Sequence, residues 1–371
     1  MTLIIGGGVY GAAVAWHLAR RGEAVELLEA KTVASGASGG PGRRGVRANC
    51  RDHRELPLMA RARALWPTLH EQLGTDPLFE RTGHLQLIER PVDMPRAETR
   101  AALQSRFGIA TSYLSEGAMR ELEPDVASFV KAALHCPDDG VAFHAATTRA
   151  YADNAVMAGA TIREGVTVDR LVTRDGKVVA VATTDGDEIP VPGRLFVLAN
   201  SGVRSLIAPW LDLPTWNLAL QVLVSKPLAE NPVRHLVGHA SRTLSLKREP
   251  DGRLMISGGR LGHWDYATGR GTPIPEEIAA NVADAVAVYP SLEGIEIETA
   301  DTGHLEAESI DSIPMVDHLP GNPHVVYAAG WTGHGWAIAP AVAELLADWA
   351  LEGRRPELLA PFAFDRFAIG R

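Results

Sequence analysis

Three glycines near the start of the chain have the spacing of a phosphate-binding turn. Gly6, Gly8 and Gly11 follow an apolar run at residues 3–5 and precede an alanine-rich segment at residues 12–21 that contains no proline. In a strand–turn–helix unit this spacing allows a tight turn, lets the main chain approach a pyrophosphate, and lets the helix pack on the strand. The pyrophosphate would then lie at a helix N-terminus, where free N–H groups and the helix dipole favour an anion.

A carboxylate follows at the place where such a unit needs one. Residues 24–28 have the composition of a second strand, and Glu29 stands at its carboxyl end. There a carboxylate accepts hydrogen bonds from ribose hydroxyls and disfavours a 2′-phosphate. The strand, helix and acid together predict a site for NAD or FAD.

A second glycine cluster lies near the other end of the chain. Gly330, Gly333, His334, Gly335 and Trp336 follow an apolar strand at residues 325–329 and precede a predicted helix at residues 340–351. This segment resembles the flavin-contacting motif of the D-amino-acid oxidase-like FAD enzymes, which include sarcosine oxidase, glycine oxidase and D-amino-acid dehydrogenase. Main-chain N–H groups ahead of a helix can stabilise the negative charge that reduction places on a flavin, which is physically consistent with FAD.

The resemblance covers nearly the whole chain and implies further FAD contacts. Those residues are Ser35, Ser38, Gly39 and Gly40 in the loop after the second strand, Val166 beside the adenine, and Ala199 at a strand end. The pair Asn200-Ser201 departs from the small residue and glycine that the family has after that strand end.

Arginines continue the predicted flavin loop at positions 43, 44 and 47. Such a run is either a solvated loop or, as the resemblance implies, a set that approaches the flavin and the substrate. Arg43 aligns best with the arginine at the flavin ring, whereas Arg44 or Arg47 would bind a substrate carboxylate. A guanidinium group suits a carboxylate because it donates two parallel hydrogen bonds.

Glu306 is the main departure from the family pattern. Counting back from Asp311, glycine oxidase and D-amino-acid dehydrogenase have a carboxylate-binding arginine at this position. Glu306 is therefore either a surface acid or a cavity residue that selects a cationic substrate. Two residues earlier, His304 stands where sarcosine oxidase-like members carry the cysteine that anchors flavin. Because neither Cys50 nor Cys136 is near in sequence, we expect noncovalent FAD, with a histidyl link as the alternative.

The expected reaction is oxidation of the C–N bond of an amine or N-substituted amino acid. Hydride transfer to flavin N5 would give an imine, so the protein supplies position and electric field rather than a Ser-His-Asp triad, for which there is no motif. The residues predicted to act in catalysis are Arg43, Arg47, Glu306 and His334. Two alternatives stay open: a D-amino-acid or opine-type dehydrogenase subunit that passes electrons to a partner, and a non-catalytic FAD-binding assembly factor.

The electron acceptor is expected to be oxygen or a redox partner. The family's oxygen-activating lysine aligns loosely with Met255, and Lys247 lies a strand away. A missing positive charge near the flavin would weaken the reaction with oxygen, which slightly favours a dehydrogenase. Residues 263–266, which include two aromatic side chains, form either a lid over an amine or an ordinary turn.

Composition excludes several other classes. With 36 basic and 45 acidic residues the chain has a net charge of −9, which disfavours a nucleic-acid binder. It has no apolar run of about 18 residues, so no membrane span is expected, and two cysteines cannot form a four-cysteine zinc site. We expect a cytoplasmic protein without a metal, acting on a small amine or amino acid.

At 371 residues the chain is long enough for two compact units. The predicted fold class is α/β (α+β), with a discontinuous Rossmann-like FAD-binding domain formed by residues 1–82, 142–205 and 305–371. Residues 83–141 and 206–304 would form a second domain, in which runs of alternating polarity predict an antiparallel sheet over the flavin.

Overall fold

The computed structural model describes residues 1–40 and 42–368. Its first sheet has six strands in the order β23-β24-β13-β1-β2-β9, and all neighbours are parallel except the edge pair β23–β24. The strands are β1 (Thr2–Ile5), β2 (Val25–Glu29), β9 (Thr161–Glu164), β13 (Arg194–Val197), β23 (Met315–Leu319) and β24 (Asn322–Ala329).

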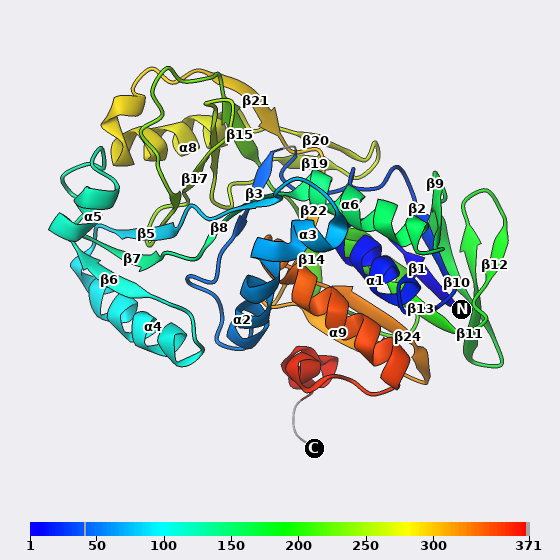
Figure 1. Cartoon of the computed structure of the whole chain (residues 1–371). Coiled ribbons are helices and arrows are strands. Elements are labelled where there is room, and N and C mark those ends of the chain that lie inside the picture. The colour runs from blue at the N-terminus through cyan, green and yellow to red at the C-terminus, as the bar shows by residue number, and fades with distance from the viewer. Residues whose placement is uncertain (41, 369–371) are drawn as a thin grey trace.

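Both faces of this sheet are buried at its centre, which explains why its central strands β1, β13 and β24 are largely apolar. Ile4, Leu27 and Phe196 point to the face covered by α1 (Val9–Ala19), α6 (His144–Met157) and α9 (Ala339–Glu352). In Figure 1, α6 and α9 lie on either side of α1. Leu3 and Leu195 alternate with these three apolar residues and point to the opposite face. That face is covered by α7 (Val203–Ile207) and by a small sheet of β10 (Val168–Arg174), β11 (Lys177–Thr183) and β12 (Glu188–Pro190).

The second sheet has eight strands in the order β21-β15-β18-β17-β16-β5-β7-β6. Its pairs are antiparallel except β16–β5, which is parallel. The strands are β5 (His84–Ile88), β6 (Ser112–Ser115), β7 (Ala132–Cys136), β15 (Val222–Ser225), β16 (Leu236–His239), β17 (Ser245–Arg248), β18 (Leu254–Ser257) and β21 (Ile297–Asp301).

Helices cover one face of the second sheet. Leu223, Val237, Leu246 and Ile256 form a core with α8 (Pro275–Val288) and with Met119 of α5 (Glu116–Leu122). The helix α4 (Met94–Arg106) packs in a separate small cluster, against Ile88 of β5 and Ala132 of β7. The opposite face of β5, β16, β17 and β18 is turned toward a cavity.

Short strands connect the two sheets. β8 (Gly140–Phe143) follows β7 and leads directly into α6, and it pairs with β3 (Arg43–Val46) and β4 (Phe79–Glu80). β14 (Thr215–Ala219) pairs with β22 (Leu305–Ser309), and the hairpin of β19 (His263–Asp265) and β20 (Arg270–Thr272) lies nearby. The helices α2 (Leu56–Leu65) and α3 (Leu69–Leu73) complete the layer beside α9 and α6.

The expected α/β class is confirmed, with a parallel sheet between helices and a separate, largely antiparallel sheet. All six strands of the first sheet come from residues 1–82, 142–205 and 305–371, and all eight of the second come from 83–141 and 206–304. The domain boundaries themselves stay a prediction. Among the described residues, no helix combines the length and the apolar character needed to cross a bilayer.

Candidate flavin and substrate site

A cavity of about 1150 Å³ is lined by residues of both sheets. Typical small-molecule pockets are about 300–1,000 Å³, so this one has room for a dinucleotide together with a small substrate. Its walls come from the ends of β1, β2 and β13, from the loop after β2, from the segment before α9, and from the second sheet.

The three glycines of the first turn have different surroundings. A Cβ atom on Gly8 would meet no protein atom within 4 Å, and Gly8 lines the cavity directly before α1. A Cβ on Gly11 would lie 1.9 Å from the carbonyl oxygen of Gly6, so Gly11 lets the helix pack on the strand and is not part of the cavity wall. Gly6 has φ of +109°, which a side chain would strain. These surroundings agree with the roles predicted for each glycine.

Glu29 lies at the end of β2 and faces the same cavity. Its Oε2 accepts the N–H of Gly7 over 2.6 Å, and its Oε1 accepts the N–H of Lys31 over 2.8 Å. The N–H of Val166 donates to the main-chain oxygen of Glu29 over 2.9 Å, which places Val166 beside the predicted ribose position. The carboxylate therefore fixes the turn and borders the space for a ribose.

The two glycine segments, more than 300 residues apart, are joined through Tyr10 at the start of α1. Its ring stacks on Trp331 with centroids 3.8 Å apart, and its hydroxyl donates to the carbonyl oxygen of Gly335 over 2.6 Å. A Cβ on Gly335 would lie 2.8 Å from the Trp331 side chain, so glycine is needed there. Helix packing thus brings the predicted pyrophosphate turn next to the predicted flavin loop.

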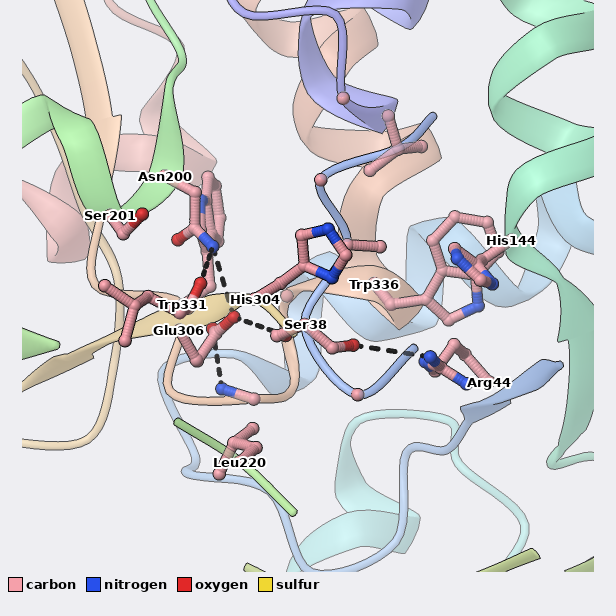
Figure 2. A pocket seen from close by; sticks show the side chains of 18 of the residues that line it. Ser38, Arg44, His144, Asn200, Ser201, Leu220, His304, Glu306, Trp331 and Trp336 are labelled. Carbon is pink, nitrogen blue, oxygen red and sulfur yellow. Dashed lines mark hydrogen bonds between the residues drawn. The ribbon is translucent and has the colours of Figure 1, made fainter. Parts of the chain in front are cut away.

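Three donor groups converge on the carboxylate of Glu306, which is only 5% exposed. Oε1 accepts the N–H of Gly333 over 2.8 Å, while Oε2 accepts the hydroxyl of Ser38 over 2.7 Å and the side-chain amide of Asn200 over 3.2 Å. Figure 2 shows these side chains converging at one end of the cavity, with His304 beside them. Glu306 is therefore not the surface acid of the first hypothesis: it ties three predicted flavin segments together.

The structure places the two adjacent arginines of β3 differently from what the predicted ring-side role of Arg43 requires. Adjacent residues of β3 point to opposite faces, as in any strand. Arg43 is buried outside the cavity lining, where it pairs with Glu80 and Glu249 and donates to the carbonyl oxygen of Arg248. Arg44 lines the cavity instead, close to His144 and Trp336 (Figure 2). Burial lowers the pKa of Arg44 to about 10, which leaves it charged at neutral pH.

Arg47 and His334 both line the cavity but differ in their surroundings. Arg47 donates to the carbonyl oxygen of Asn49 over 2.7 Å, which leaves guanidinium donors for a ligand. The ring of His334 lies between protein groups: Nδ1 is 3.2 Å from both Arg51 Nη1 and Glu55 Oε1, and Nε2 is 3.1 Å from the carbonyl oxygen of Ser312. This geometry gives the ring a structural environment and does not support its predicted catalytic role.

The loop that presents Arg47 is held by a buried carboxylate. Asp139 Oδ1 accepts the N–H of Ala48 over 2.8 Å, and Oδ2 accepts the N–H of Asn49 over 3.0 Å. Burial raises the pKa of Asp139 to about 6, although both hydrogen bonds oppose the shift. The ionised group thus fixes the direction in which the chain leaves β3.

Alternate residues of the second sheet form the opposite wall. The side chains or Cα atoms that line the cavity belong to His84, Gln86, Leu236, Gly238, Ser245, Lys247, Met255 and Ser257. Lys247 is 6% exposed, and burial together with the charge of Arg44 lowers its pKa to about 7. Lys247, which the sequence placed a strand away from the position of the family's lysine, faces the cavity and lies directly opposite Met255 in the β17–β18 pair.

The remaining predicted cofactor residues divide into two groups. The cavity is lined by Ser35, Ser38, Gly39, Ala199, Gly333, Gly335 and Trp336. Gly40 and Gly330 are outside the lining, because a Cβ on Gly40 would meet Asp301 at 2.5 Å and one on Gly330 would meet Ser309 at 2.9 Å. Both have positive φ, so these two glycines serve the chain's own packing.

Several polar atoms in the wall suit an additional bound group. Trp336 Nε1 and His304 Nδ1 are buried without a partner among the described residues, and both residues line the cavity. Buried donors normally have partners, so these atoms fit a ligand with acceptors at this place. Together with the open space at Gly8, they show that the residues present fit FAD.

Three features of the site could not be predicted from the positions of the residues along the sequence. Cys50 lines the cavity, although it lies far along the chain from the predicted covalent position. Trp264 also lines the cavity, whereas Tyr266 is 70% exposed, so only part of the 263–266 segment faces the cavity. Asn200 adopts φ of +43°, which asparagine tolerates better than most residues, and this directs its amide to Glu306.

A parallel sheet between helices and a cavity shared with a second sheet are what an α/β oxidoreductase with a dinucleotide cofactor would have. The comparisons agree: residues 1–349 match the family of FAD dependent oxidoreductases (DAO), and the chain belongs to this family. The match confirms the expected cofactor, FAD, and the expected oxidoreductase class. Within the described residues, no cluster of three or more potential ligands could hold a metal ion.

Relatives and solved structures cover almost the whole chain. It is 26% identical to the glycine oxidase of Bacillus licheniformis over 94% of this chain and 92% of that protein. It is also 26% identical to the bifunctional protein ThiO/ThiG of Trichormus variabilis over 98% of this chain, and it spans about half (55%) of that longer protein. The structure of L-proline dehydrogenase from P. horikoshii aligns with a TM-score of 0.88 at 25% identity, covering 98% of this chain and 97% of the other.

Proposed function

We propose that this protein oxidises the C–N bond of a small amine or N-substituted amino acid with FAD as the hydride acceptor. The observation that supports this most is one continuous cavity, in which the predicted FAD segments face Arg44 and Arg47 across from a polar sheet wall. Two of the similar proteins, glycine oxidase and L-proline dehydrogenase, are by name enzymes that act on small amino acids.

The chain's own residues would bind and orient the substrate and the flavin, rather than transfer protons in a relay. FAD, when bound, accepts the hydride. Arg47 would hold a substrate carboxylate, Arg44 would stabilise negative charge beside the flavin, and the Gly333–Gly335 loop would support the ring. A substrate held in this way reacts mainly because it is positioned.

The test is a screen of amines and amino acids with the purified protein, followed by bleaching of the flavin absorbance without oxygen. Bleaching by a primary or secondary amine supports the proposal. Absence of bleaching by every amine, with FAD bound, would favour the alternative of a non-catalytic FAD-binding factor. Admitting oxygen afterwards separates an oxidase, which regains its colour quickly, from a dehydrogenase that needs a redox partner.

A further inference from the structure

The wall formed by the second sheet carries positive charge without any carboxylate. Among the described residues that line the cavity between positions 206 and 304, the ionisable ones are His239, Arg242, Lys247 and His304. Arg242 is already paired with Glu89 at 2.7 Å and with Asp284 at 3.2 Å. Lys247 is therefore the ammonium group that this wall offers to the cavity.

Lys247 is buried without a counterion of its own. In the described part of the chain its ammonium donates no hydrogen bond and forms no ion pair, while the nearby acid Glu249 is engaged with Arg43. Arg43 and Arg44 repel the ammonium, which adds to the effect of burial on its pKa. A buried cation is costly unless an anion accompanies it, so an anionic ligand group here would stabilise both.

Carboxylates elsewhere in the cavity do not supply that anion. Glu29 and Asp169 are at the end where β2 and β10 meet the dinucleotide turn. Glu306 already accepts hydrogen bonds from three donors, which uses most of the acceptor capacity of a carboxylate. A substrate with an extra cation would thus meet Lys247 and the arginines rather than a free acid.

We infer that Lys247 binds a second carboxylate of the substrate, so that the preferred substrate is an amino acid or secondary amine with two carboxylates. One carboxylate would be held by Arg47 and the other by Lys247 on the sheet wall. This inference rests on the proposed function and replaces the expectation of a cationic substrate, which depended on Glu306 alone.

The test uses probe pairs that differ by one carboxylate. Glutamate is compared with norvaline, in both D and L forms, and N-(2-carboxyethyl)glycine is compared with N-propylglycine. Dissociation constants are measured from the change in flavin absorbance on binding, and reduction rates from anaerobic bleaching. We expect the dicarboxylate member of at least one pair to bind roughly ten- to a hundredfold more tightly.

Variants then assign the preference to one residue. Lys247→Met removes the charge at similar length and should reduce the ratio within the pair to about one, whereas Lys247→Arg should retain part of it. Lys131→Met is the control, because that exposed lysine pairs with Glu116 outside the cavity lining and should keep the wild-type ratio.

The possible outcomes separate this inference from the proposed function. Bleaching by uncharged members, with no Lys247-dependent preference in binding, would overturn the inference and leave the proposed function standing. Tight, Lys247-dependent binding of a dicarboxylate without bleaching by any amine would support the inference and overturn the proposed function.

Discussion

The main-chain N–H of Gly333 donates to Oε1 of Glu306 over 2.8 Å, which joins the loop before α9 to strand β22. The same carboxylate holds Ser38 from the loop after β2 and Asn200 from the end of β13. Glu306 is buried and holds together three segments that are predicted to contact the flavin, so we expect it to act through the shape of the cofactor site. We therefore treat Glu306 as a positioning residue.

Glu306→Ala should weaken FAD binding and lower the melting temperature. Each hydrogen bond to a charged group contributes roughly 1.5–3 kcal/mol, and the variant leaves three donors without their acceptor. Glu306→Gln should retain most of both properties, because its amide oxygen can still accept from Gly333. The measurements are FAD dissociation by fluorescence and thermal unfolding of the holoenzyme. Unchanged FAD affinity combined with an altered ranking of amines would instead show that Glu306 contacts the substrate.

Gly8→Ala and Gly11→Ala form a matched pair in one turn. An added methyl group at Gly8 meets no protein atom within 4 Å, so the apoprotein should keep its stability. It would occupy space beside the pyrophosphate, and we expect FAD affinity to fall by at least about tenfold. At Gly11 the methyl group would be 1.9 Å from the Gly6 oxygen, so that variant should lose stability even without FAD. Normal flavin occupancy in Gly8→Ala would contradict the placement of the pyrophosphate.

Substitutions of the two adjacent arginines of β3 should affect different properties, the rate of flavin reduction for Arg44 and the stability of the fold for Arg43. Arg44→Met removes positive charge beside the flavin and should slow anaerobic flavin reduction by roughly ten- to a hundredfold, while Arg44→Lys retains part of the rate. Arg43→Met leaves the nearly buried Glu249 without its cation and should cost about 3 kcal/mol of unfolding free energy. Stopped-flow absorbance and denaturant unfolding distinguish the two. A slower reduction in the Arg43 variant alone would restore the original sequence-based assignment.

FAD should be released intact when the protein is precipitated with acid. The family position for a covalent cysteine is His304, but Cys50 also lines the cavity, so the expectation needs a direct check. Burial raises the pKa of the Cys50 thiol, which disfavours the thiolate needed for attack on a flavin. Flavin that stays in the protein pellet would contradict noncovalent binding, and Cys50→Ser and His304→Ala would then identify the attachment point.

Sequence patterns predicted the first sheet and its ligand well because they are local. The turn at Gly6–Gly11, the acid at Glu29 and the helix after Gly335 each combine a strand, a glycine and a helix within a few residues. Such local patterns can be recognised without knowledge of the rest of the fold. The family resemblance then supplied the segments that only tertiary structure brings together.

The substrate wall could not be predicted in the same way. In β5 and β17 the polar residues His84, Gln86, Ser245 and Lys247 alternate with apolar ones, and this pattern is the same for a strand facing solvent and one facing a cavity. Which of two adjacent arginines enters the cavity depends on the register of β3, which a one-residue shift reverses. The role of Glu306 depends on hydrogen-bond donors at positions 38, 200 and 333. These positions are far apart in the sequence, so no local pattern predicts that they meet.

Asp139 should make the stability of the protein depend on pH between about 4 and 6. Burial raises its pKa from 3.8 to about 6, so the unfolded chain releases this proton at lower pH than the folded protein does. The contribution of the group is therefore fully present below about pH 4 and is lost as pH rises through about 6, by roughly 3 kcal/mol at most. Asp139→Asn removes this titration, and the unfolding free energy of wild type relative to the variant should fall over that interval. Asp138→Asn, at the half-buried neighbouring carboxylate that pairs with Arg63 and Arg81, is the control and should keep the wild-type pH profile. If Asp139→Asn and wild type show parallel profiles from pH 4 to 7, Asp139 is already ionised throughout and the loop carrying Arg47 is held by charge at every pH tested.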